Sequence, residues 1–487
     1  QTARGPPLMA WRYTLAELAR IVGAPLPEGE GGGEGYQVET CGRAGGAVGR
    51  PATTTGFARV CTDTRQLRVG DLFVALRGPS FDGDAFVPEA FQRGAAGALC
   101  REFHAEGPCL VVADPLRALQ TFAAHHRAKH DIPVLAITGS CGKTTAKDLT
   151  AAVLASRYVV AKTEGNLNND IGCPLSLLGM DETTEFAVME LGANHPGEIA
   201  ALCSLVRPTE SAITVVTPAH LEGFGSLDAV ARAKGEIVEA LPPDGCFYVN
   251  TDDPWCVRLA VAYGGDQVRF GASGDVALRA CDFDASGDML LTIDPIGRLR
   301  LPLAVRAHAV HVLIAVAVGL RHGIDEFEGP LREACAKLAH FRILRLGPLE
   351  ILDDSYNANP ASMAAAFEAL ADRPGPGARF AALGSMLELG DAARELHREV
   401  GRRAGAAGVA ALFAYGPNAE EMAEAAGAAG VAEATVLADH RVIAEAVAAR
   451  AQFGDRLLVK GSRGMRMEKV IEALRTVYAT RYADAWL

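Results

Sequence analysis

The sequence predicts an α/β protein of three domains: a small mixed α/β domain, a central parallel-sheet domain and a last, doubly wound domain. Length is the first reason, because 487 residues exceed what one hydrophobic core normally supports. The second is that apolar β-type runs alternate with helical patterns from Pro133 onward and again from Leu349, as in parallel sheets covered by helices. The third is a glycine-rich turn between a predicted strand and a predicted helix at residues 139–145.

Composition and charge exclude several classes of function. The formal net charge is −12 and no Lys/Arg cluster is present, so nucleic-acid binding is not expected. The 11 cysteines include no Cys-x-x-Cys pair, which favours reduced thiols over disulfides or structural zinc. No apolar run approaches the roughly 18 residues that suggest a membrane span, and the N-terminus lacks a signal-peptide pattern. Residues 1–8 are expected to be a tag remnant or an unstructured extension, with Met9 as the native start. We therefore expect a protein of the cytoplasm.

The first domain is predicted over residues 9–125. An amphipathic helix is expected at 13–22, followed at 27–56 by a surface loop rich in Gly, Thr and Pro. Short apolar β-type runs then flank a helical stretch near 88–94, and they lie at 59–61, 71–76 and 97–99. This order indicates a small mixed α/β unit.

The central domain is predicted over residues 126–340. Its expected strands are the apolar runs at 134–137, 158–161, 186–189, 212–216 and 247–249. Between residues 268 and 305 the β-type runs become shorter and more polar, which predicts an antiparallel appendage. Two helices, at 310–322 and 326–338, are expected to close the domain.

The last domain is predicted over residues 341–487 as a doubly wound, Rossmann-like sheet. Ala/Glu/Arg-rich helical patterns separate its expected strands, which lie at 349–352, 380–383, 410–414 and 456–459. Ligands of such sheets bind at the carboxyl ends of the strands. The motifs with chemical potential follow strands in this way.

The run Gly139-Ser140-Cys141-Gly142-Lys143-Thr144-Thr145 is predicted to be a P-loop that binds nucleotide phosphates. Its glycines let backbone N–H groups converge on phosphate oxygens, Lys143 supplies a positive charge, and the hydroxyl of Thr144 or Thr145 can ligate Mg²⁺. The commoner G-x-x-x-x-G-K-[ST] spacing would need glycine at position 137, where the chain has Ile137. This loop alone leaves kinase, ATPase, GTPase and ligase activities open.

An asparagine-rich loop with Asn166, Asn168 and Asn169 follows the predicted strand at 158–161. Turn formation explains it as well as function does, because Asn tolerates left-handed backbone and caps helices. The functional alternative is a polar cradle for a sugar or a carboxylate near the γ-phosphate.

Three further candidates lie in the central domain. Glu190 ends an apolar strand and is the expected Mg²⁺ holder, with helix capping as the alternative. His220 follows the strand at 212–216 and could ligate a second metal, although a single histidine is more commonly structural. By composition, Lys234 is expected to be an ordinary solvated lysine on a helix.

Polar residues also follow two strands of the last domain. The run 353–360, Asp-Asp-Ser-Tyr-Asn-Ala-Asn-Pro, leads from a strand into a helix and predicts a binding loop. Lys460, Ser462 and Arg463 follow the strand at 456–459. Their two cations are suited to recognising a carboxylate.

In this order the motifs resemble those of the Mur ligase family, over a stretch from Cys61 to about Leu474. The resemblance implies a monomeric, ATP-dependent, ADP-forming ligase of peptidoglycan synthesis with ATP and Mg²⁺ as cofactors. The runs 219–226 and 353–360 are similar to those of the member that joins D-alanyl-D-alanine to UDP-N-acetylmuramoyl-tripeptide through an acyl phosphate. The three domains would then bind the UDP-substrate, bind ATP and complete the ligase site, respectively.

The resemblance also implies roles for individual residues. Lys143, Lys234, His220 and Glu190 would be catalytic, and Thr144, Glu190, His220 and a carbamylated Lys234 would hold metal. Carbamylation would turn a cation into an anion beside the metals. Asn250, Arg342 and Asp354 would join the P-loop in binding ATP. The substrate-binding residues would be Thr64 and Arg65 on the uridine side, with Asn166, Asn168, Asn169, Tyr356, Asn357, Asn359, Lys460, Ser462 and Arg463.

Departures from the family pattern and alternative functions remain. In the segment 305–311 only Arg306 is kept from the family's Gly-Arg-His-Asn-x-x-Asn run, with Ala307 and His311 among the replacements. The near alternatives are a Mur ligase that adds a diamino acid and a folylpolyglutamate synthase-like ligase. A P-loop kinase or ATPase, and a non-catalytic nucleotide-binding protein, are alternatives of another class.

Overall fold

The computed structural model describes residues 12–25, 54–338, 341–373 and 375–482. The expected extension at residues 1–8 and nearly all of the loop expected at 27–56 lie outside these residues. Contacts between Cα atoms divide the chain into two units. The first comprises Gln1–Val134, Tyr158–Leu191 and Ala201–Pro208, and the second comprises Leu135–Arg157, Gly192–Ala200 and Thr209–Leu487.

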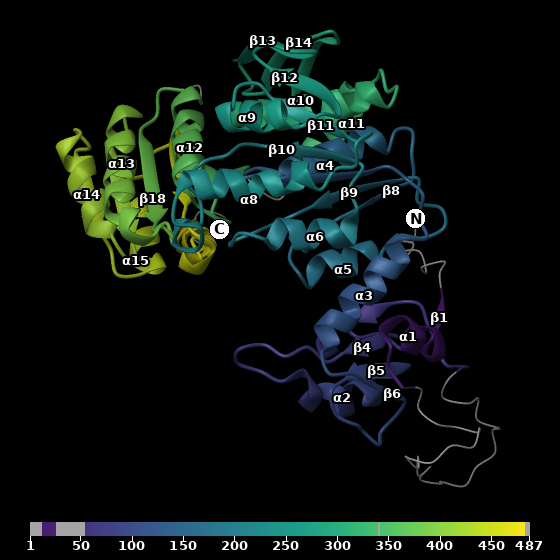
Figure 1. The fold of residues 1–487 in the computed structure, drawn as a ribbon. Helices are drawn as coiled ribbons and strands as arrows, with labels where there is room; N and C mark the ends of the chain where they lie inside the picture. The colour runs from purple at the N-terminus through teal and green to yellow at the C-terminus, as the bar shows by residue number, and fades with distance from the viewer. Residues whose placement is uncertain (1–11, 26–53, 339–340, 374, 483–487) are drawn as a thin grey trace, which may run out of the picture. The chain divides into compact units, whose positions relative to one another are not determined.

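The N-terminal part of the first unit contains a small parallel sheet, as expected (Figure 1). Its strands, in spatial order, are β3 (Val60–Cys61), β4 (Leu72–Val74), β5 (Gly97–Cys100) and β6 (Cys109–Val111). A separate antiparallel pair joins β1 (Tyr13–Thr14) to β2 (Gly56–Phe57). The helices here are α1 (Leu15–Val22), α2 (Val87–Gln92) and α3 (Pro115–Arg127).

The first helix begins two residues later than the apolar pattern suggested. The Thr14 side chain accepts a hydrogen bond from the Glu17 backbone N–H, and the Glu17 carboxylate accepts one from the Thr14 backbone. This reciprocal capping box ends the strand and starts the helix at Leu15.

The remainder of the first unit contains the parallel pair β8 (Val160–Lys162) and β9 (Phe186–Glu190). Helix α5 (Gly172–Leu177) packs against α3, and α6 (Glu198–Val206) ends in this unit. Strand β9 is buried at every position, as expected for a central parallel strand. Its carboxyl end carries Glu190.

In the second unit, the sheet that carries the P-loop has the strand order β15-β14-β13-β12-β11-β10-β7. Its parallel strands are β7 (Val134–Thr138), β10 (Glu210–Ile213), β11 (Cys246–Asn250) and β12 (Asp266–Gly271). The antiparallel appendage is confirmed and comprises β13 (Val276–Phe283), β14 (Met289–Asp294) and β15 (Gly297–Leu301). Strand β10 ends at Ile213 rather than at 216, because Thr214 and Val215 pair with residues around the P-loop instead.

Helices of two kinds accompany this sheet. Helix α10 (Ala309–Arg321) is apolar around most of its circumference and packs against α4 (Lys143–Leu154), so it forms part of the core. The others are α7 (Leu221–Phe224), α8 (Leu227–Glu239), α9 (Pro254–Ala262) and α11 (Glu328–Cys335). The expected helices at 310–322 and 326–338 are thus confirmed within a few residues.

The last sheet is doubly wound, as expected, with the order β16-β17-β21-β18-β19-β20 (Figure 1). Its strands are β16 (Arg342–Leu346), β17 (Leu349–Asp354), β18 (Arg379–Gly384), β19 (Ala411–Tyr415), β20 (Glu433–Val436) and β21 (Asp455–Lys460). All neighbouring pairs are parallel except β16 with β17. The edge strands β16 and β20 were not predicted.

Two hydrophobic clusters cover the two faces of this sheet. One gathers α12 (Pro360–Asp372), α13 (Ala393–Ala406) and α14 (Ala419–Ala428), and the other gathers α15 (His440–Arg450) and α16 (Glu468–Tyr482). Helices on both faces explain why the buried strands are apolar at nearly every position. Among the described residues, no helix is both long enough and apolar enough to cross a membrane.

Candidate active site

The P-loop has a backbone that only glycine adopts comfortably. Gly139 and Gly142 have φ of 146° and 76°. A Cβ atom at Gly139 would lie 1.9 Å from Thr214 Oγ1, and one at Gly142 would lie 1.9 Å from His311 Nε2. Both the torsion and the close packing therefore require glycine here.

Hydrogen bonds with neighbouring residues hold the P-loop in place. The Ser140 backbone N–H donates to Val215 O at 2.8 Å, and the Thr214 hydroxyl donates to Cys141 O at 2.6 Å. Lys143, the first residue of α4, folds back so that its Nζ donates to Gly139 O at 2.9 Å. Lys143 thus places its charge at the loop and at the helix N-terminus, where anions bind. Of the two threonines, Thr144 is the more accessible, because Thr145 is buried.

Asn250 and Asp253 stabilise the segment that supports the loop. Asn250 Nδ2 donates to Thr214 O at 2.8 Å, and Asp253 Oδ2 accepts from the Val216 backbone N–H at 2.6 Å. Both side chains are buried. The expected contact of Asn250 with adenine stays a prediction, and Asp253 is a supporting residue that the sequence reasoning missed. Its position at a strand end, before Pro254, was the available signal.

In the first unit, the asparagine-rich loop caps a helix, as one of the two alternatives expected, whereas the polar cradle for a sugar or a carboxylate stays a prediction. Asn168 Nδ2 donates to Glu190 Oε1 at 2.7 Å. Asn169 Oδ1 instead accepts from the Gly172 backbone N–H at 2.8 Å and so caps α5. Asn166 is exposed. Glu190 is buried at the end of β9, and its backbone N–H donates to Thr163 Oγ1 at 2.9 Å.

Lys234 is buried, with 2% of its surface exposed, so the expectation of a solvated helix lysine is wrong. It lies on the buried face of α8 with Val230, Ile237 and Val238. These residues recur at the i, i+4, i+7 and i+8 spacing of one helix face, which was the signal in the sequence. Lys234 Nζ lies 3.4 Å from Ala193 O and 5.6 Å from the centroid of the Phe224 ring.

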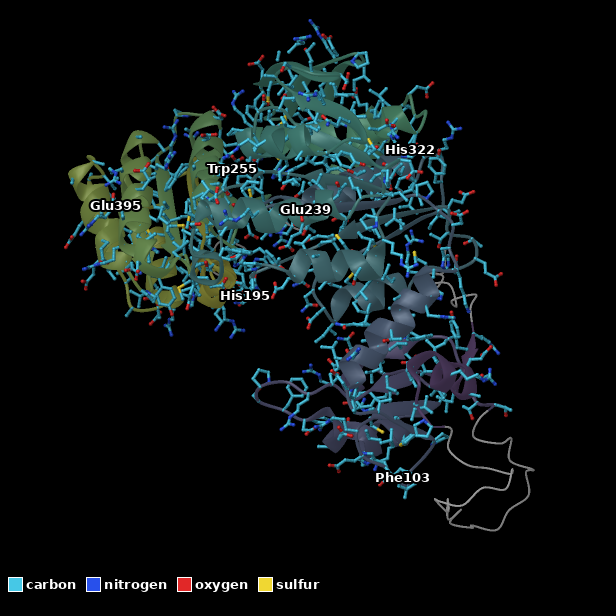
Figure 2. The ribbon with its side chains drawn as sticks, viewed as in Figure 1. Phe103, His195, Glu239, Trp255, His322 and Glu395 are labelled. Carbon is cyan, nitrogen blue, oxygen red and sulfur yellow. The ribbon has the colours of Figure 1, made fainter. Side chains whose placement is uncertain are left out.

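The pKa of Lys234 is lowered to about 7, chiefly by burial and additionally by the charge of Lys143, whereas Glu198 and Glu236 oppose the shift. A lysine in such a place is substantially neutral near pH 7 and therefore nucleophilic. The two glutamates serve the backbone instead: Glu236 accepts from the Gly197 N–H at 2.7 Å and Glu198 from the Asn194 N–H at 2.7 Å. His195, labelled in Figure 2, contacts Glu198 at the surface.

His220 lies at the N-terminus of α7 with a left-handed φ of 50°. Its Nδ1 forms a hydrogen bond with the carboxylate of Glu388, in the loop after β18. The Glu222 backbone N–H donates to Glu388 O at 3.2 Å. Sequence reasoning missed Glu388, although its place after the carboxyl end of a predicted strand was a signal.

The loop after β17 is held by a buried lysine. Lys460 Nζ donates to Asp354 Oδ2 at 2.6 Å and to Asn357 O at 2.8 Å. Asn359 Oδ1 caps α12 through the Ser362 N–H at 2.8 Å, and Asn359 Nδ2 lies 3.4 Å from Ser140 O of the P-loop. The structure therefore brings the 353–360 loop into contact with the phosphate-binding loop.

The other predicted residues of the last domain divide into internal and exposed ones. Ser462 is buried and its hydroxyl donates to Ala358 O at 3.2 Å. Arg342 pairs with Asp353 at 2.7 Å. Tyr356 and Arg463 are exposed, with the guanidinium 5.6 Å from the centre of the Tyr356 ring. These two offer a cation and an aromatic surface to a ligand.

Thr64 and Arg65 belong to the first unit, in a short 3₁₀ turn capped by Asp63. Thr64 is buried and Arg65 is exposed, with its guanidinium 2.8 Å from Asp63. An exposed arginine keeps donors available for a phosphate or a nucleotide base.

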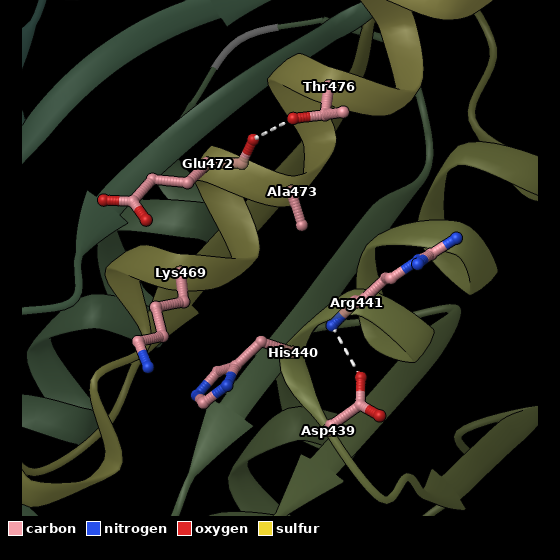
Figure 3. Close-up of a pocket in the computed structure, with 7 residues that line it drawn as sticks. All are labelled: Asp439, His440, Arg441, Lys469, Glu472, Ala473 and Thr476. Carbon is pink, nitrogen blue, oxygen red and sulfur yellow. Dashed lines mark hydrogen bonds between the residues drawn. The ribbon is translucent and has the colours of Figure 1, made fainter.

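A pocket on the last sheet is separate from these residues (Figure 3). It lies between the N-terminal turns of α15 and α16 and is lined by Asp439, His440, Arg441, Lys469, Glu472, Ala473 and Thr476. Asp439 caps α15 through the Arg441 N–H at 2.8 Å, and His440 Nε2 bonds to Met465 O at 2.7 Å. Internal structure thus accounts for its polar groups.

The chemistry of the side-chain donors decides which metal they fit. In the described part of the chain, no group of three or more His, Cys, Asp or Glu side chains could hold a metal ion. Mg²⁺ does not need such a group, because it usually keeps several waters and takes phosphate oxygens with one or two protein ligands. The accessible Thr144 hydroxyl and the neutral amine of Lys234, which can become a carbamate, fit that need.

Comparison with known proteins identifies relatives. The chain matches the family models of the Mur ligase middle domain over residues 137–319 and of the Mur ligase, glutamate ligase domain over residues 341–463. The UDP-N-acetylmuramoyl-tripeptide–D-alanyl-D-alanine ligase of Escherichia coli (strain K12) is 38% identical over 85% of this chain and 93% of its own length. The Bacillus subtilis (strain 168) protein of that name is 34% identical over 85% of this chain and 92% of its own length.

Solved structures agree with these sequence relatives. A crystal structure of MurF from Acinetobacter baumannii superposes with a TM-score of 0.83 at 28% identity, covering 96% of this chain and 100% of that one. MurF ligase from Thermotoga maritima, in complex with ADP, superposes with a TM-score of 0.77 at 28% identity. The match covers 87% of this chain and 98% of that one. The expected α/β fold with three domains is the fold of these neighbours.

Proposed function

The chain belongs to the Mur ligase family, and on this premise we propose that it joins D-alanyl-D-alanine to UDP-N-acetylmuramoyl-tripeptide with ATP, in peptidoglycan synthesis. Relatives named for this reaction support the proposal, the first of them at 38% identity over 85% of the chain. The observation that carries it is the approach of Asn359 Nδ2 to Ser140 O at 3.4 Å. A ligase needs the 353–360 loop beside the P-loop, whereas a simple kinase or ATPase leaves that loop without a role.

The reaction has two steps. The terminal carboxylate of the tripeptide attacks the γ-phosphorus of ATP, the bond to the β-phosphate oxygen breaks, and ADP leaves behind an acyl phosphate. The amine of D-alanyl-D-alanine then attacks the acyl carbon, an amide bond forms, and phosphate leaves with the C–O electron pair as the amine loses a proton. Activation is needed because a carboxylate is a poor electrophile.

The residues of the P-loop supply the electrostatic part of the first step. Backbone N–H groups of residues 141–145 and the Lys143 ammonium offset the charge on the phosphates, which grows as phosphoryl transfer proceeds. Because the loop is already fixed by Thr214 and Ser140, these donors need little reorganisation. Exclusion of water by the 353–360 loop protects the acyl phosphate from hydrolysis.

We assign Thr144, Glu190, His220 and carbamylated Lys234 to Mg²⁺. When bound, Mg²⁺ would supply positive charge against the phosphate oxygens. The neutral amine of Lys234 can add to CO₂ and lose a proton, which yields the carbamate. Thr64 and Arg65 are assigned to the uridine nucleotide, and Asn250, Arg342 and Asp354 to the ATP side.

Two coarser assignments complete the proposal. The domain limits are 9–125, 126–340 and 341–487, in the order UDP-substrate binding, ATP binding and ligase completion. The protein acts as a monomer in the cytoplasm. The exposed Tyr356 and Arg463, with Asn166, Asn168, Asn169, Asn357, Asn359, Lys460 and Ser462, form or support the substrate side.

Replacement of Lys143 tests the mechanism. We expect Lys143→Ala to lower phosphate release in the presence of both substrates by at least about 100-fold, because a donor to the transferring phosphoryl group is lost. Lys337→Ala is the matched control, since Lys337 is exposed and pairs with Glu333 on the surface. Phosphate release by Lys143→Ala at a near-wild-type rate would contradict the mechanism. Replacing the dipeptide with a diamino acid or with glutamate separates this reaction from those of the related ligases.

A further inference from the structure

We infer that Glu388 is a positioning residue for His220: its carboxylate fixes the tautomer and the orientation of the imidazole that the proposed function places beside Mg²⁺. The inference rests on that proposed function and adds a residue to it. The contact links two loops that are 168 positions apart in the chain.

The first argument is hydrogen-bond chemistry. An ionised carboxylate can only accept, so the proton of a neutral His220 must lie on Nδ1, the atom that faces Glu388. The lone pair is then on Nε2, the atom left for a metal. Histidine ligands commonly donate their other ring N–H to a carboxylate in this way, which orients the ring and raises its basicity.

The second argument is backbone conformation. Among the described residues, six other than glycine have a positive φ, and His220 at 50° and Glu388 at 63° are two of them. Such torsions cost free energy and persist where the surroundings determine them, commonly at functional sites. Here the two strained residues contact each other.

The third argument is the closeness of the two backbones. The Glu222 N–H donates to Glu388 O at 3.2 Å, two residues after His220. A Cβ atom at Gly390 would lie 3.8 Å from Glu222 Cα. The loop after β18 is thus held against the loop after β10 by a backbone hydrogen bond as well as by side chains. The orientation of His220 therefore depends on the last sheet being in place.

A plain surface ion pair is the competing explanation. The His220 and Glu388 side chains are 32% and 56% exposed, and exposed pairs contribute little to stability. That explanation predicts no effect of Glu388 on metal binding.

The test uses Mn²⁺ as a spectroscopic probe, bound to the full chain in the presence of ADP. We expect Glu388→Ala to weaken Mn²⁺ binding, measured by electron paramagnetic resonance, by about 10-fold to 100-fold. The kcat of phosphate release should fall while the KM for D-alanyl-D-alanine stays constant. Glu388→Gln should recover most of the affinity, because its amide oxygen still accepts from Nδ1.

Two further variants make the outcomes distinct. Glu395→Gln, whose parent residue is labelled in Figure 2 and pairs with Arg402 at 2.7 Å, should leave Mn²⁺ binding unchanged. If His220→Ala weakens Mn²⁺ binding and Glu388→Ala does not, the inference is overturned and the proposed function stands. If His220→Ala also has no effect, the assignment of His220 to metal is itself wrong. Loss of affinity that Glu388→Gln does not restore, together with a lower Tm, would show a structural role and overturn the inference.

Discussion

Lys234 and Lys460 are both almost completely buried, with 2% and 1% of their surfaces exposed, yet their surroundings differ. Lys460 donates to the Asp354 carboxylate at 2.6 Å and to a backbone carbonyl at 2.8 Å. Lys234 has the Ala193 carbonyl at 3.4 Å and an aromatic ring near its amine. Burial beside a carboxylate makes a lysine a structural cation, whereas burial without one makes it a neutral base.

The difference matches the positions of the two residues in the proposed reaction. Lys460 holds the 353–360 loop in shape, because its ammonium links Asp354 to Asn357 within that loop. Burial lowers the pKa of Lys234 to about 7, and the positive charge of Lys143 contributes to this shift. A base in that state can react with CO₂. Replacing each lysine should therefore damage a different property.

The largest effect is expected from Lys234→Met. This variant should lose about 1,000-fold in kcat, equal to about 4 kcal/mol of transition-state stabilisation, because the carbamate can no longer form. Its free energy of unfolding should be unchanged or higher, since an apolar side chain replaces an amine that is costly to bury. Steady-state kinetics and chemical denaturation measure the two quantities. Full activity of the variant would break the comparison.

Lys460→Met should show the opposite pattern, with a loss in the free energy of unfolding of about 3–5 kcal/mol. The reason is that the Asp354 carboxylate keeps its charge after it loses the Lys460 ammonium. Adding Asp354→Asn in the same chain should restore more than half of the loss, because the charge that Lys460 compensates is removed. Denaturation midpoints that are equal in wild type and Lys460→Met would contradict this explanation.

His126 extends the comparison to a third buried base. Burial lowers its pKa from 6.5 to about 4, although the hydrogen bond to Met180 O opposes the shift. Its ring nitrogens bond to Tyr13 Oη at 3.0 Å and to Met180 O at 2.9 Å, both uncharged groups. Like Lys234, it is a base buried without a carboxylate.

The sign of the pH effect follows from this shift. Between pH 6.5 and about 4 the unfolded chain binds a proton at His126 that the folded chain does not. The stabilisation is therefore complete above pH 6.5 and declines by up to about 3 kcal/mol as the pH falls to about 4. We expect the stability difference between wild type and His126→Gln to narrow over this range. If the free energies of unfolding of wild type and His126→Gln change in parallel with pH, His126 is not the group responsible.

The P-loop and the strand-end residues could be predicted because their signals are local. Gly139, Gly142 and Lys143 lie within five positions, and the rule that ligands bind at the carboxyl ends of parallel strands led to Glu190 and His220. Asn168 and Asn169 show the limit of such reasoning. Adjacent residues of one type share a sequence signal, but Asn168 bonds to Glu190 whereas Asn169 caps α5.

The features that the sequence did not reveal are determined by tertiary contacts. Glu388 contacts His220, which is 168 positions away in the chain. No local sequence pattern indicates that pair. Lys234 was assigned to solvent from its composition, whereas the spacing of Val230, Ile237 and Val238 places it on the buried face of α8. The edge strands β16 and β20 are half-buried or exposed at every position, so they lack the continuous apolar run that marked the buried strands.

The central claim is that ATP cleavage by this chain is coupled to amide formation. The most direct measurement is phosphate release from ATP by the wild-type chain with UDP-N-acetylmuramoyl-tripeptide, with and without D-alanyl-D-alanine. The account predicts sustained release only when both substrates are present, with one amide bond formed per phosphate. Equal rates of ADP formation without the dipeptide would contradict it.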